Sequence, residues 1–331
     1  MNQITFPRKS YFGDTVEKPE LEEWFLYGTS KTLKGKKNYN LVDEIGKRLK
    51  TISSANNEVE KRLLDFISRN LAFILVCSPE VLGKLIGKKR FNISGNDKFL
   101  KDLLQAFNYD SYRDNKLRDL ACFLNVKSCP YCNMSYTLFA ENGKSYSQMA
   151  TKFQFDHFYG KEKYPFFSMS LYNLIPSCAI CNQKKSIKHL SLNFHPYSNG
   201  INKQFHFKVE NPLPLIFGAK KDKINIDLEL ENKAEANKTE LEDYDKLFDI
   251  KLRYSRHRDV VQEVFDKAYL EMYYGDSRFF EFLDDKEYLY RIIYGTYMDE
   301  NEIEKRPMSK FIQDIRKQAI DKIYNDLLIM Y

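Results

Sequence analysis

Two pairs of cysteines, each spaced Cys-x-x-Cys, enclose a short set of polar residues near the middle of the chain. The first pair is Cys129 and Cys132, and the second is Cys178 and Cys181. The thiolates of two such knuckles together bind zinc in a tetrahedral site. A closed four-thiolate site leaves no position for water, so we expect a structural zinc ion that holds the two ends of this segment together.

The polar residues between and beside the knuckles have the types needed for hydrolysis. An imidazole titrates near neutral pH and can take a proton from water, which is the role expected of His157. The carboxylate of Asp156 and the amide oxygen of Asn182 suit a hard cation, and Asn173 could orient the histidine. A cation there would stabilise charge on a phosphate and its leaving oxygen, so these residues predict metal-assisted phosphodiester hydrolysis.

These residues, in this order, resemble the motif of the HNH endonucleases of the ββα-metal superfamily, in the form that has zinc knuckles and Asn as the third motif residue. The resemblance covers roughly residues 125–200. It rests on Asp156-His157, Asn173-Leu174 and Cys178 to Asn182, followed by Lys184-Lys185. Within that superfamily, the runs Cys129–Asn133, Tyr164–Ser177 and His195–Tyr197 are similar to PtuB-like nucleases of Septu-type and retron-associated anti-phage systems.

The resemblance implies a role for each motif residue. His157 would be the general base, Asp156 and Asn182 would bind one Mg²⁺ or Mn²⁺, and Asn173 would hold the active-site loop and His157 in place. The four knuckle cysteines would bind the zinc. One departure is Phe158-Tyr159-Gly160, where many HNH nucleases have two apolar residues and then proline. The resemblance also implies anti-phage defence and a partner, either an ATPase of the ABC/SMC-like type or a retron complex.

Charge points to a polyanionic substrate. The chain carries a formal net charge of +6. Most of this excess lies between Lys152 and Lys188, a segment with six lysines and only two acidic residues, Asp156 and Glu162. Lysines position a phosphate backbone without reading its sequence, so we expect a nucleic acid, DNA rather than RNA, and little sequence preference. The candidate contacts are Lys161, Lys163, Lys184, Lys185, Lys188 and His195.

The elements that must position these residues follow from apolar periodicity. Helical spacing predicts a helix over about 57–77 and another over about 111–124, and alternation predicts strands over 135–140, 152–158, 204–210 and 224–231. In the second strand, Phe155 and His157 share one face and Asp156 points to the other. Residues 232–243 are polar and predict a linker, and a last helix is expected to open at Pro307.

The predicted fold class is α+β, with a ββα-metal core between helical N- and C-terminal regions. The expected regions are 1–124, helical and without obvious chemistry; 125–200, the nuclease core; 201–232, a β extension; and 244–331, helical. With 331 residues and 43% apolar residues, the chain can bury a sizeable core. Cys77 and Cys122, in apolar helical contexts, are expected in that core.

No stretch approaches the roughly 20 apolar residues of a membrane span, and Met1 to Arg8 has no apolar signal core, so we expect a cytoplasmic protein without a membrane partner. A different class of function stays open. The chain could be a zinc-stabilised nucleic-acid-binding or scaffold protein whose HNH residues are vestigial. The intact Asp156, His157, Asn173 and Asn182 argue against that alternative.

Overall fold

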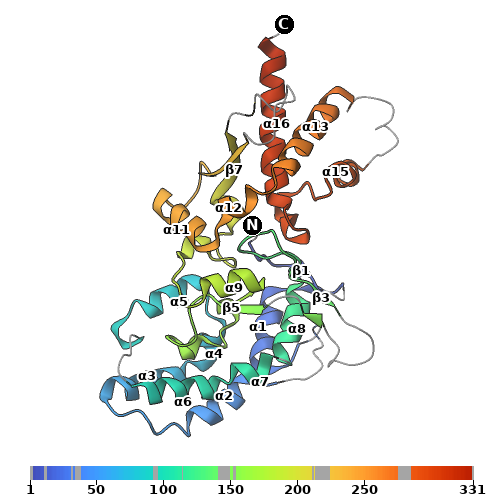
Figure 1. The fold of residues 1–331 in the computed structure, drawn as a ribbon. Helices are drawn as coiled ribbons and strands as arrows, with labels where there is room; N and C mark the ends of the chain where they lie inside the picture. The colour runs from blue at the N-terminus through green and yellow to red at the C-terminus, as the bar shows by residue number, and fades with distance from the viewer. Residues whose placement is uncertain are drawn as a thin grey trace. The chain divides into compact units, whose positions relative to one another are not determined.

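The protein is α+β in a computed structural model that describes residues 3–10, 13–30, 33, 39–91, 96–113, 115–140, 150–151, 154–210, 212, 224–274 and 285–329. The chain divides into two compact units. The N-terminal unit comprises Ile4–Val126 and Thr137–Ser198. The C-terminal unit comprises Met1–Gln3, Lys127–Tyr136 and Asn199–Tyr331. Figure 1 labels many of the helices and strands of the two units.

Helices make up most of the N-terminal unit. Its α-helices are α1 (Lys18–Tyr27), α2 (Leu41–Leu49), α3 (Glu58–Arg69), α4 (Leu71–Val76), α5 (Pro79–Ile86), α6 (Asp97–Phe107), α7 (Tyr109–Arg113), α8 (Lys116–Leu124) and α9 (Ala179–Lys185). Asparagine starts several of them: the side chains of Asn40, Asn57 and Asn96 accept hydrogen bonds from backbone N–H groups in the first turns of α2, α3 and α6.

The helix predicted over 57–77 is two helices, α3 and α4, which meet at Asn70. Near the end of α3, the Phe66 carbonyl accepts hydrogen bonds from both the backbone N–H of Asn70, at 3.0 Å, and its side-chain amide, at 2.8 Å. The helix predicted over 111–124 is likewise divided into α7 and α8, with the N-cap residue of α8 at Asn115.

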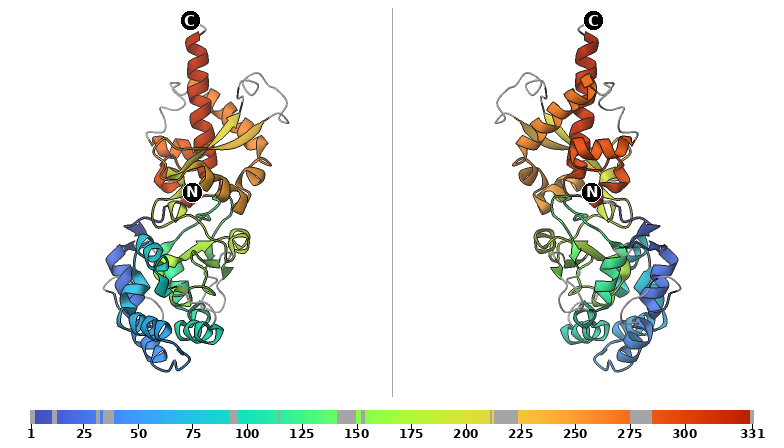
Figure 2. Two further views of the ribbon diagram at one scale, coloured as in Figure 1. Left: turned by 90° about the vertical axis from the view of Figure 1, so that its left-hand side faces the viewer. Right: turned by 90° about the vertical axis from the view of Figure 1, so that its right-hand side faces the viewer.

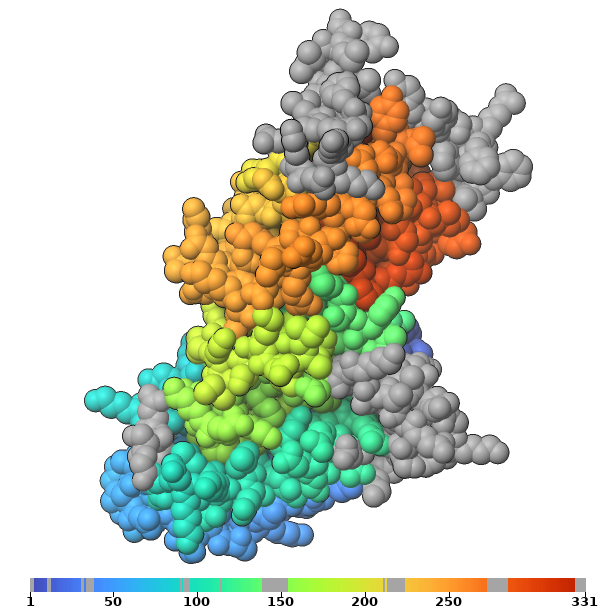
Figure 3. Space-filling model, in the orientation of Figure 1, coloured from blue at the N-terminus to red at the C-terminus, as the bar shows by residue number. Residues whose placement is uncertain are grey.

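The strands of the N-terminal unit are short antiparallel pairs. They are β1 (Arg8–Lys9) with β2 (Thr15–Val16), β3 (Phe139–Ala140) with β4 (Ala150–Thr151), and β5 (Gln154–His157) with β6 (Leu174–Ser177). In the last pair, Asp156 lies opposite Ile175 and His157 opposite Leu174. Helix α9 follows β6 after one residue and contacts β5. In the space-filling view, this segment borders the helices that precede it in the unit (Figure 3).

Two predicted strands of this region are shorter than expected. The strand predicted over 135–140 consists of β3, while Tyr136 forms an isolated bridge with Ser128. The strand predicted over 152–158 is β5, and residues 152 and 153 lie outside the described residues. Asn142 and Gly143, a pair of residues that predicts a turn, also lie outside them.

The C-terminal unit packs helices on a two-stranded sheet. Its elements are β7 (Phe205–Glu210), β8 (Asn225–Leu230), α11 (Lys238–Phe248), α12 (Ile250–Tyr254), α13 (Arg258–Tyr274), α15 (Lys286–Tyr294) and α16 (Ser309–Ile329). Both strands lie within the predicted ranges. The side views show α16 running beside α13 (Figure 2), and α16 also contacts β7. Phe311, Ile315, Ala319 and Ile323 form the buried stripe of α16.

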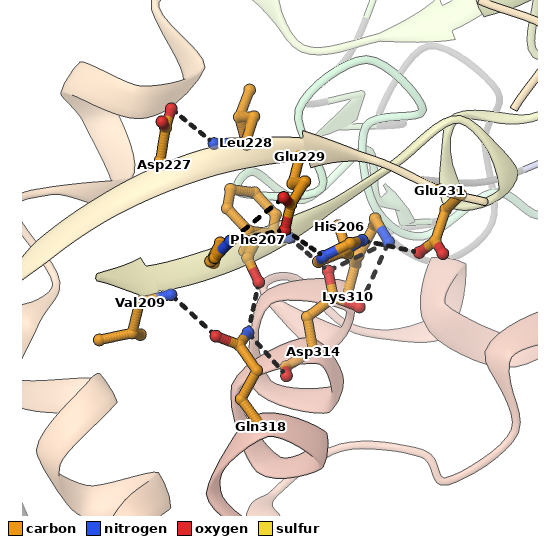
Figure 4. Close-up of polar contacts among 11 residues, drawn as sticks. His206, Phe207, Val209, Asp227, Leu228, Glu229, Glu231, Lys310, Asp314 and Gln318 are labelled. Carbon is orange, nitrogen blue, oxygen red and sulfur yellow. Dashed lines mark hydrogen bonds and ion pairs between the residues drawn. The ribbon is translucent and has the colours of Figure 1, made fainter. Parts of the chain in front are cut away.

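Side chains of α16 complete the hydrogen bonding of β7. Asp314 Oδ2 accepts from the Phe207 N–H at 2.9 Å, and Gln318 Oε1 accepts from the Val209 N–H at 2.9 Å. The Gln318 amide also donates to the Phe207 carbonyl (Figure 4). The helix thus takes the place of a third strand at this edge of the sheet.

Two predictions for the C-terminal unit are wrong in detail. Residues 232–243 are not all linker, because α11 begins at Lys238 behind a capping box formed by Asn237 and Glu240. The last helix begins at Ser309 rather than Pro307, since Met308 has a positive φ of 63°. Among the described residues, no helix is long and apolar enough to cross a membrane.

Candidate functional site

The first cysteine knuckle is a tight turn held by its own backbone. The Cys129 carbonyl accepts a hydrogen bond from the Asn133 N–H at 2.7 Å, and the Cys129 N–H donates to the Ser135 carbonyl at 2.9 Å. Asn133 has a φ of 48°, a conformation that asparagine tolerates better than most residues. Its buried side chain donates to the Ile303 carbonyl and accepts from the Lys310 N–H, both at 3.0 Å. These contacts fix the turn that presents both cysteines.

The four knuckle cysteines form one buried cluster. Their Sγ atoms all lie within 4.8 Å of one another, and all four thiols are free of disulfides. In a tetrahedral site with Zn–S bonds of about 2.3 Å, the sulfur atoms are roughly 3.8 Å apart, so the cluster fits a zinc ion. The Met134 N–H, at 3.4 Å, and the Arg253 guanidinium, at 3.6 Å, donate to Cys132 Sγ and favour its thiolate. The cluster could therefore hold a structural metal such as zinc.

The two remaining cysteines have the predicted core positions. Cys77 and Cys122 are buried, and neither belongs to the cluster. Burial raises the pKa of the Cys77 thiol to about 12, so this thiol stays protonated and unreactive at neutral pH.

Asp156, His157 and Asn182 line one cavity of about 570 Å³ in the N-terminal unit. Strand β5 supplies Asp156 and His157 at its end, and α9 supplies Asn182. Neighbouring residues of a strand point to opposite faces. Asp156 and His157 nevertheless both line the cavity, which lies at the end of the strand. Three of the residues singled out in the sequence are thus brought together by a strand–strand–helix segment.

His157 is buried and has a defined proton position. Its Nε2 lies 3.0 Å from the Ser168 carbonyl oxygen. A carbonyl only accepts hydrogen bonds, so Nε2 carries the proton and Nδ1 is the nitrogen that can accept one. Burial, and to a smaller degree the positive charges of Lys161 and Lys185, lower the pKa of His157 to about 3. The imidazole is therefore neutral at physiological pH, as a general base must be.

Asp156 is paired with a buried lysine from α9. Lys185 Nζ lies 3.2 Å from Asp156 Oδ2 and donates a hydrogen bond to the His157 carbonyl at 2.7 Å. The prediction that Lys185 contacts nucleic acid is wrong, because its side chain is fully buried and turned into the protein. Its role is to tie α9 to the Asp156-His157 dipeptide.

Asn182 faces the cavity with its amide already oriented. Its Nδ2 donates to Gln154 Oε1 at 2.5 Å, which leaves the amide oxygen as the atom that can bind a cation. Asp156 and Asn182 together offer oxygen ligands of the kind that Mg²⁺ prefers. In the part of the chain that the structure describes, no second group of three or more His, Cys, Asp and Glu residues forms a metal site. A cation here would therefore rely on two side chains, substrate oxygens and water, as Mg²⁺ commonly does.

Asn173 holds the loop after β5 and does not contact the imidazole. Its buried side chain accepts from the Tyr159 N–H at 2.7 Å and donates to the carbonyls of Tyr159 and Phe167 at 3.1 and 2.9 Å. Ser168, whose carbonyl orients His157, directly follows this loop. The effect of Asn173 on the histidine is thus indirect.

Part of the cavity lining comes from helices in which no sequence motif singled out a residue. Tyr109 and Arg113 of α7 and Arg118 of α8 line the cavity. Residues of the region 1–124, expected to be without obvious chemistry, thus lie beside the predicted site residues. Tyr109 packs against His157, with ring centroids 4.5 Å apart, and its hydroxyl donates to the Phe155 carbonyl at 3.4 Å. No local spacing could have revealed this, because the contact joins residues far apart in sequence.

The remaining predicted nucleic-acid contacts divide into surface and buried residues. Lys161 lines the cavity, whereas Lys163, Lys184 and Lys188 are exposed or half-buried and lie outside its lining. His195 is fully buried, so the prediction that it contacts substrate is wrong. Its ring packs on Phe158, with centroids 4.1 Å apart, and its Nδ1 accepts from the Tyr197 N–H at 3.2 Å.

No family model matches the chain, and neither a curated protein nor a solved structure matches it.

Proposed function

We propose that the protein is a metal-dependent endonuclease with an HNH site of the ββα-metal type, which hydrolyses phosphodiester bonds of DNA. One observation carries the proposal: Asp156, His157 and Asn182 line a single cavity, and the strand–strand–helix segment β5, β6 and α9 supplies all three. The resemblance of these residues to the HNH motif supports the same activity, and the thiolate cluster beside the motif supports the zinc-knuckle form.

His157 is the general base of the proposed reaction. With Nε2–H donated to the Ser168 carbonyl, Nδ1 takes the proton of the attacking water. Asn173 donates a hydrogen bond to the carbonyl of Phe167 and so fixes the loop that precedes Ser168. The Ser168 carbonyl is thereby held beside Nε2 of His157. Tyr109, packed on the imidazole, excludes water from one face of it.

Asp156 and Asn182 would hold one Mg²⁺ or Mn²⁺ through Asp156 oxygen and the Asn182 amide oxygen. When bound, this cation would stabilise negative charge on the phosphate and on the leaving oxygen. Lys185 occupies one side of the carboxylate and sets its orientation, and Gln154 sets the orientation of the Asn182 amide.

The alternative, a zinc-stabilised nucleic-acid-binding or scaffold protein with a vestigial site, is favoured by one specific contact. The charge of Asp156 is already balanced by Lys185, so this carboxylate does not need a cation to be stable in the interior. The neutral, oriented His157 beside an oriented Asn182 is not needed in such a protein, and it favours the nuclease.

A plasmid assay separates the two functions. Supercoiled DNA is incubated with the purified chain and either Mg²⁺, Mn²⁺ or EDTA, with Asp156→Asn as the matched variant. If the protein is a nuclease, the wild type with Mg²⁺ or Mn²⁺ should produce nicked or linear DNA. The wild type with EDTA, and Asp156→Asn under all conditions, should leave the plasmid supercoiled. A chain that binds DNA but leaves it supercoiled under all conditions would establish the alternative.

We further propose that the nuclease acts in anti-phage defence with an ATPase partner of the ABC/SMC-like type or within a retron complex. Large apolar side chains exposed on α13, α15 and α16 support a partner surface: Leu270, Tyr288, Ile292 and Tyr324. Co-expression with the product of the neighbouring gene, followed by size-exclusion chromatography, tests the pairing. Co-elution that is lost when residues 307–331 are removed supports it, and separate elution opposes it.

A further inference from the structure

We propose that Arg113 and Arg118 bind the phosphates of the DNA strand on either side of the cleaved bond, and that α7 and α8 form the substrate-binding wall of the active site. The inference rests on the proposed function and deepens it, because it assigns a substrate-contacting surface outside the HNH motif. It starts from the cavity that these two arginines share with Asp156 and His157.

Helix α7 is fixed against the base. Tyr109 contacts the imidazole of His157, and its hydroxyl is bonded to the backbone of β5. Residues four apart lie on the same face of a helix, about 6 Å apart along its axis. Arg113 therefore lies one turn from the residue that touches the base, on the same face, and its side chain is 58% exposed. A guanidinium on this long side chain can reach the phosphate next to the one attacked.

Arg118 extends the same wall. It lies in the first turn of α8, is half-buried, and lines the cavity beside Leu117. Guanidinium groups bind phosphates through two parallel hydrogen bonds, which lysine cannot do. Both arginines line the cavity from the consecutive helices α7 and α8, so each could bind one phosphate of a strand.

Once the Asp156–Lys185 pair is set aside, the charged side chains of the cavity lining favour an anion. Asp156 is balanced by Lys185, and Asp110, 72% exposed, lies 3.8 Å from Arg113 and 3.8 Å from Lys161. Exposed ion pairs of this length contribute little, so a phosphate competes well with Asp110. Apart from Asp156, the charged residues of the lining are three cations and two acids: Arg113, Arg118 and Lys161 against Asp110 and Glu162.

The test compares binding and cleavage of a fluorescein-labelled DNA duplex by the full chain. Binding is measured by anisotropy over a range of NaCl concentrations in a His157→Ala background, so that the probe stays intact. The variants are Arg113→Gln, Arg118→Gln and the pair. The matched control is Arg62→Gln with Arg69→Gln on α3, where both side chains are at least 76% exposed and neither lines the cavity.

Each single cavity variant loses one charged hydrogen-bonded contact and should bind DNA roughly ten-fold more weakly. The double variant loses two such contacts and should bind roughly a hundred-fold more weakly. The pair should also reduce the salt slope of log K by about 2, and the control pair should bind within about two-fold of the parent. In the wild-type background, KM should rise while kcat changes little, because these contacts exist before the reaction begins.

Each outcome decides the inference separately from the nuclease activity. Weaker binding by the cavity pair than by the control supports the arginine wall, even if the wild-type chain cuts nothing and the proposed nuclease activity fails. Equal binding by both pairs overturns the arginine wall, while cleavage by the wild type would leave the nuclease standing. Absence of any DNA binding by the parent overturns both.

Discussion

Lys185 Nζ lies 3.2 Å from Asp156 Oδ2, with the lysine side chain fully buried and the aspartate side chain 3% exposed. The same ammonium group donates to the His157 carbonyl at 2.7 Å. Asn182 and Lys185 are three residues apart on α9, so one face of this helix supplies both the cavity amide and the counterion of the cavity carboxylate. The pair couples the position of the helix to that of the candidate base.

Lys185→Met should destabilise the protein by about 3–5 kcal/mol, because it leaves a buried carboxylate without its counterion. Adding Asp156→Asn should recover much of that loss, since a neutral amide needs no counterion. Urea unfolding of the two single variants and the double variant measures both effects. If Lys185→Met is as stable as the wild type, the ion pair does not exist in solution.

The cysteine cluster predicts one zinc ion per chain. Cys178→Ser should lower the zinc content and strongly destabilise the protein, because the binding energy of a structural zinc is folding energy. Cys77→Ser is the matched control: Cys77 is buried but outside the cluster, so this variant should keep its zinc. Elemental analysis of both proteins checks the prediction. A zinc-free wild type that is fully folded would contradict it.

Asn173→Asp should destabilise the loop by about 2–4 kcal/mol despite its nearly unchanged shape. A carboxylate lacks the two N–H donors that the Asn173 amide gives to the carbonyls of Tyr159 and Phe167. Asn57→Asp, the same chemical change at the N-cap of α3, should be nearly neutral, because aspartate caps helices equally well. Denaturant unfolding compares the two; equal stabilities would show that the loop does not depend on Asn173.

Buried His195 predicts loss of stability in acid. Burial lowers the pKa of His195 to about 3, whereas an unfolded histidine titrates near about 6.5. Between these values the unfolded chain takes up a proton that the folded chain does not, so stability falls by about 1.4 kcal/mol per pH unit as pH decreases from about 6.5.

His195→Asn tests this contribution. Asparagine keeps an acceptor for the Tyr197 N–H but cannot be protonated at this pH. The free energy of unfolding, measured from about pH 7 to about pH 5, should fall less steeply in the variant than in the wild type. Parallel curves would mean that His195 is already protonated in the folded protein.

The sequence was sufficient for the features that depend on local spacing. Two Cys-x-x-Cys pairs predicted the thiolate cluster, and alternation predicted β7 and β8 within a residue or two. The capping box of Asn237 and Glu240 was also present in the sequence, but the charged composition around it concealed the start of α11. Spacing alone could place these elements because each is determined by neighbours in the chain.

Features that depend on distant parts of the chain could not be predicted in this way. A lysine in a run of basic residues is usually solvated, and only the packing of α9 on β5 turns Lys185 into the buried partner of Asp156. His195 and the cavity wall formed by α7 and α8 are similar cases. Their surroundings come from segments that no local pattern connects to them.

The rate of DNA cleavage by His157→Ala tests the proposed nuclease most directly. Under single-turnover conditions with Mg²⁺, loss of the general base should slow cleavage by about 10²–10⁴-fold, while zinc content and DNA affinity stay near those of the wild type. A large loss of rate with unchanged binding is the predicted result. Cleavage by His157→Ala at the wild-type rate would contradict the account, because the base would then lie elsewhere.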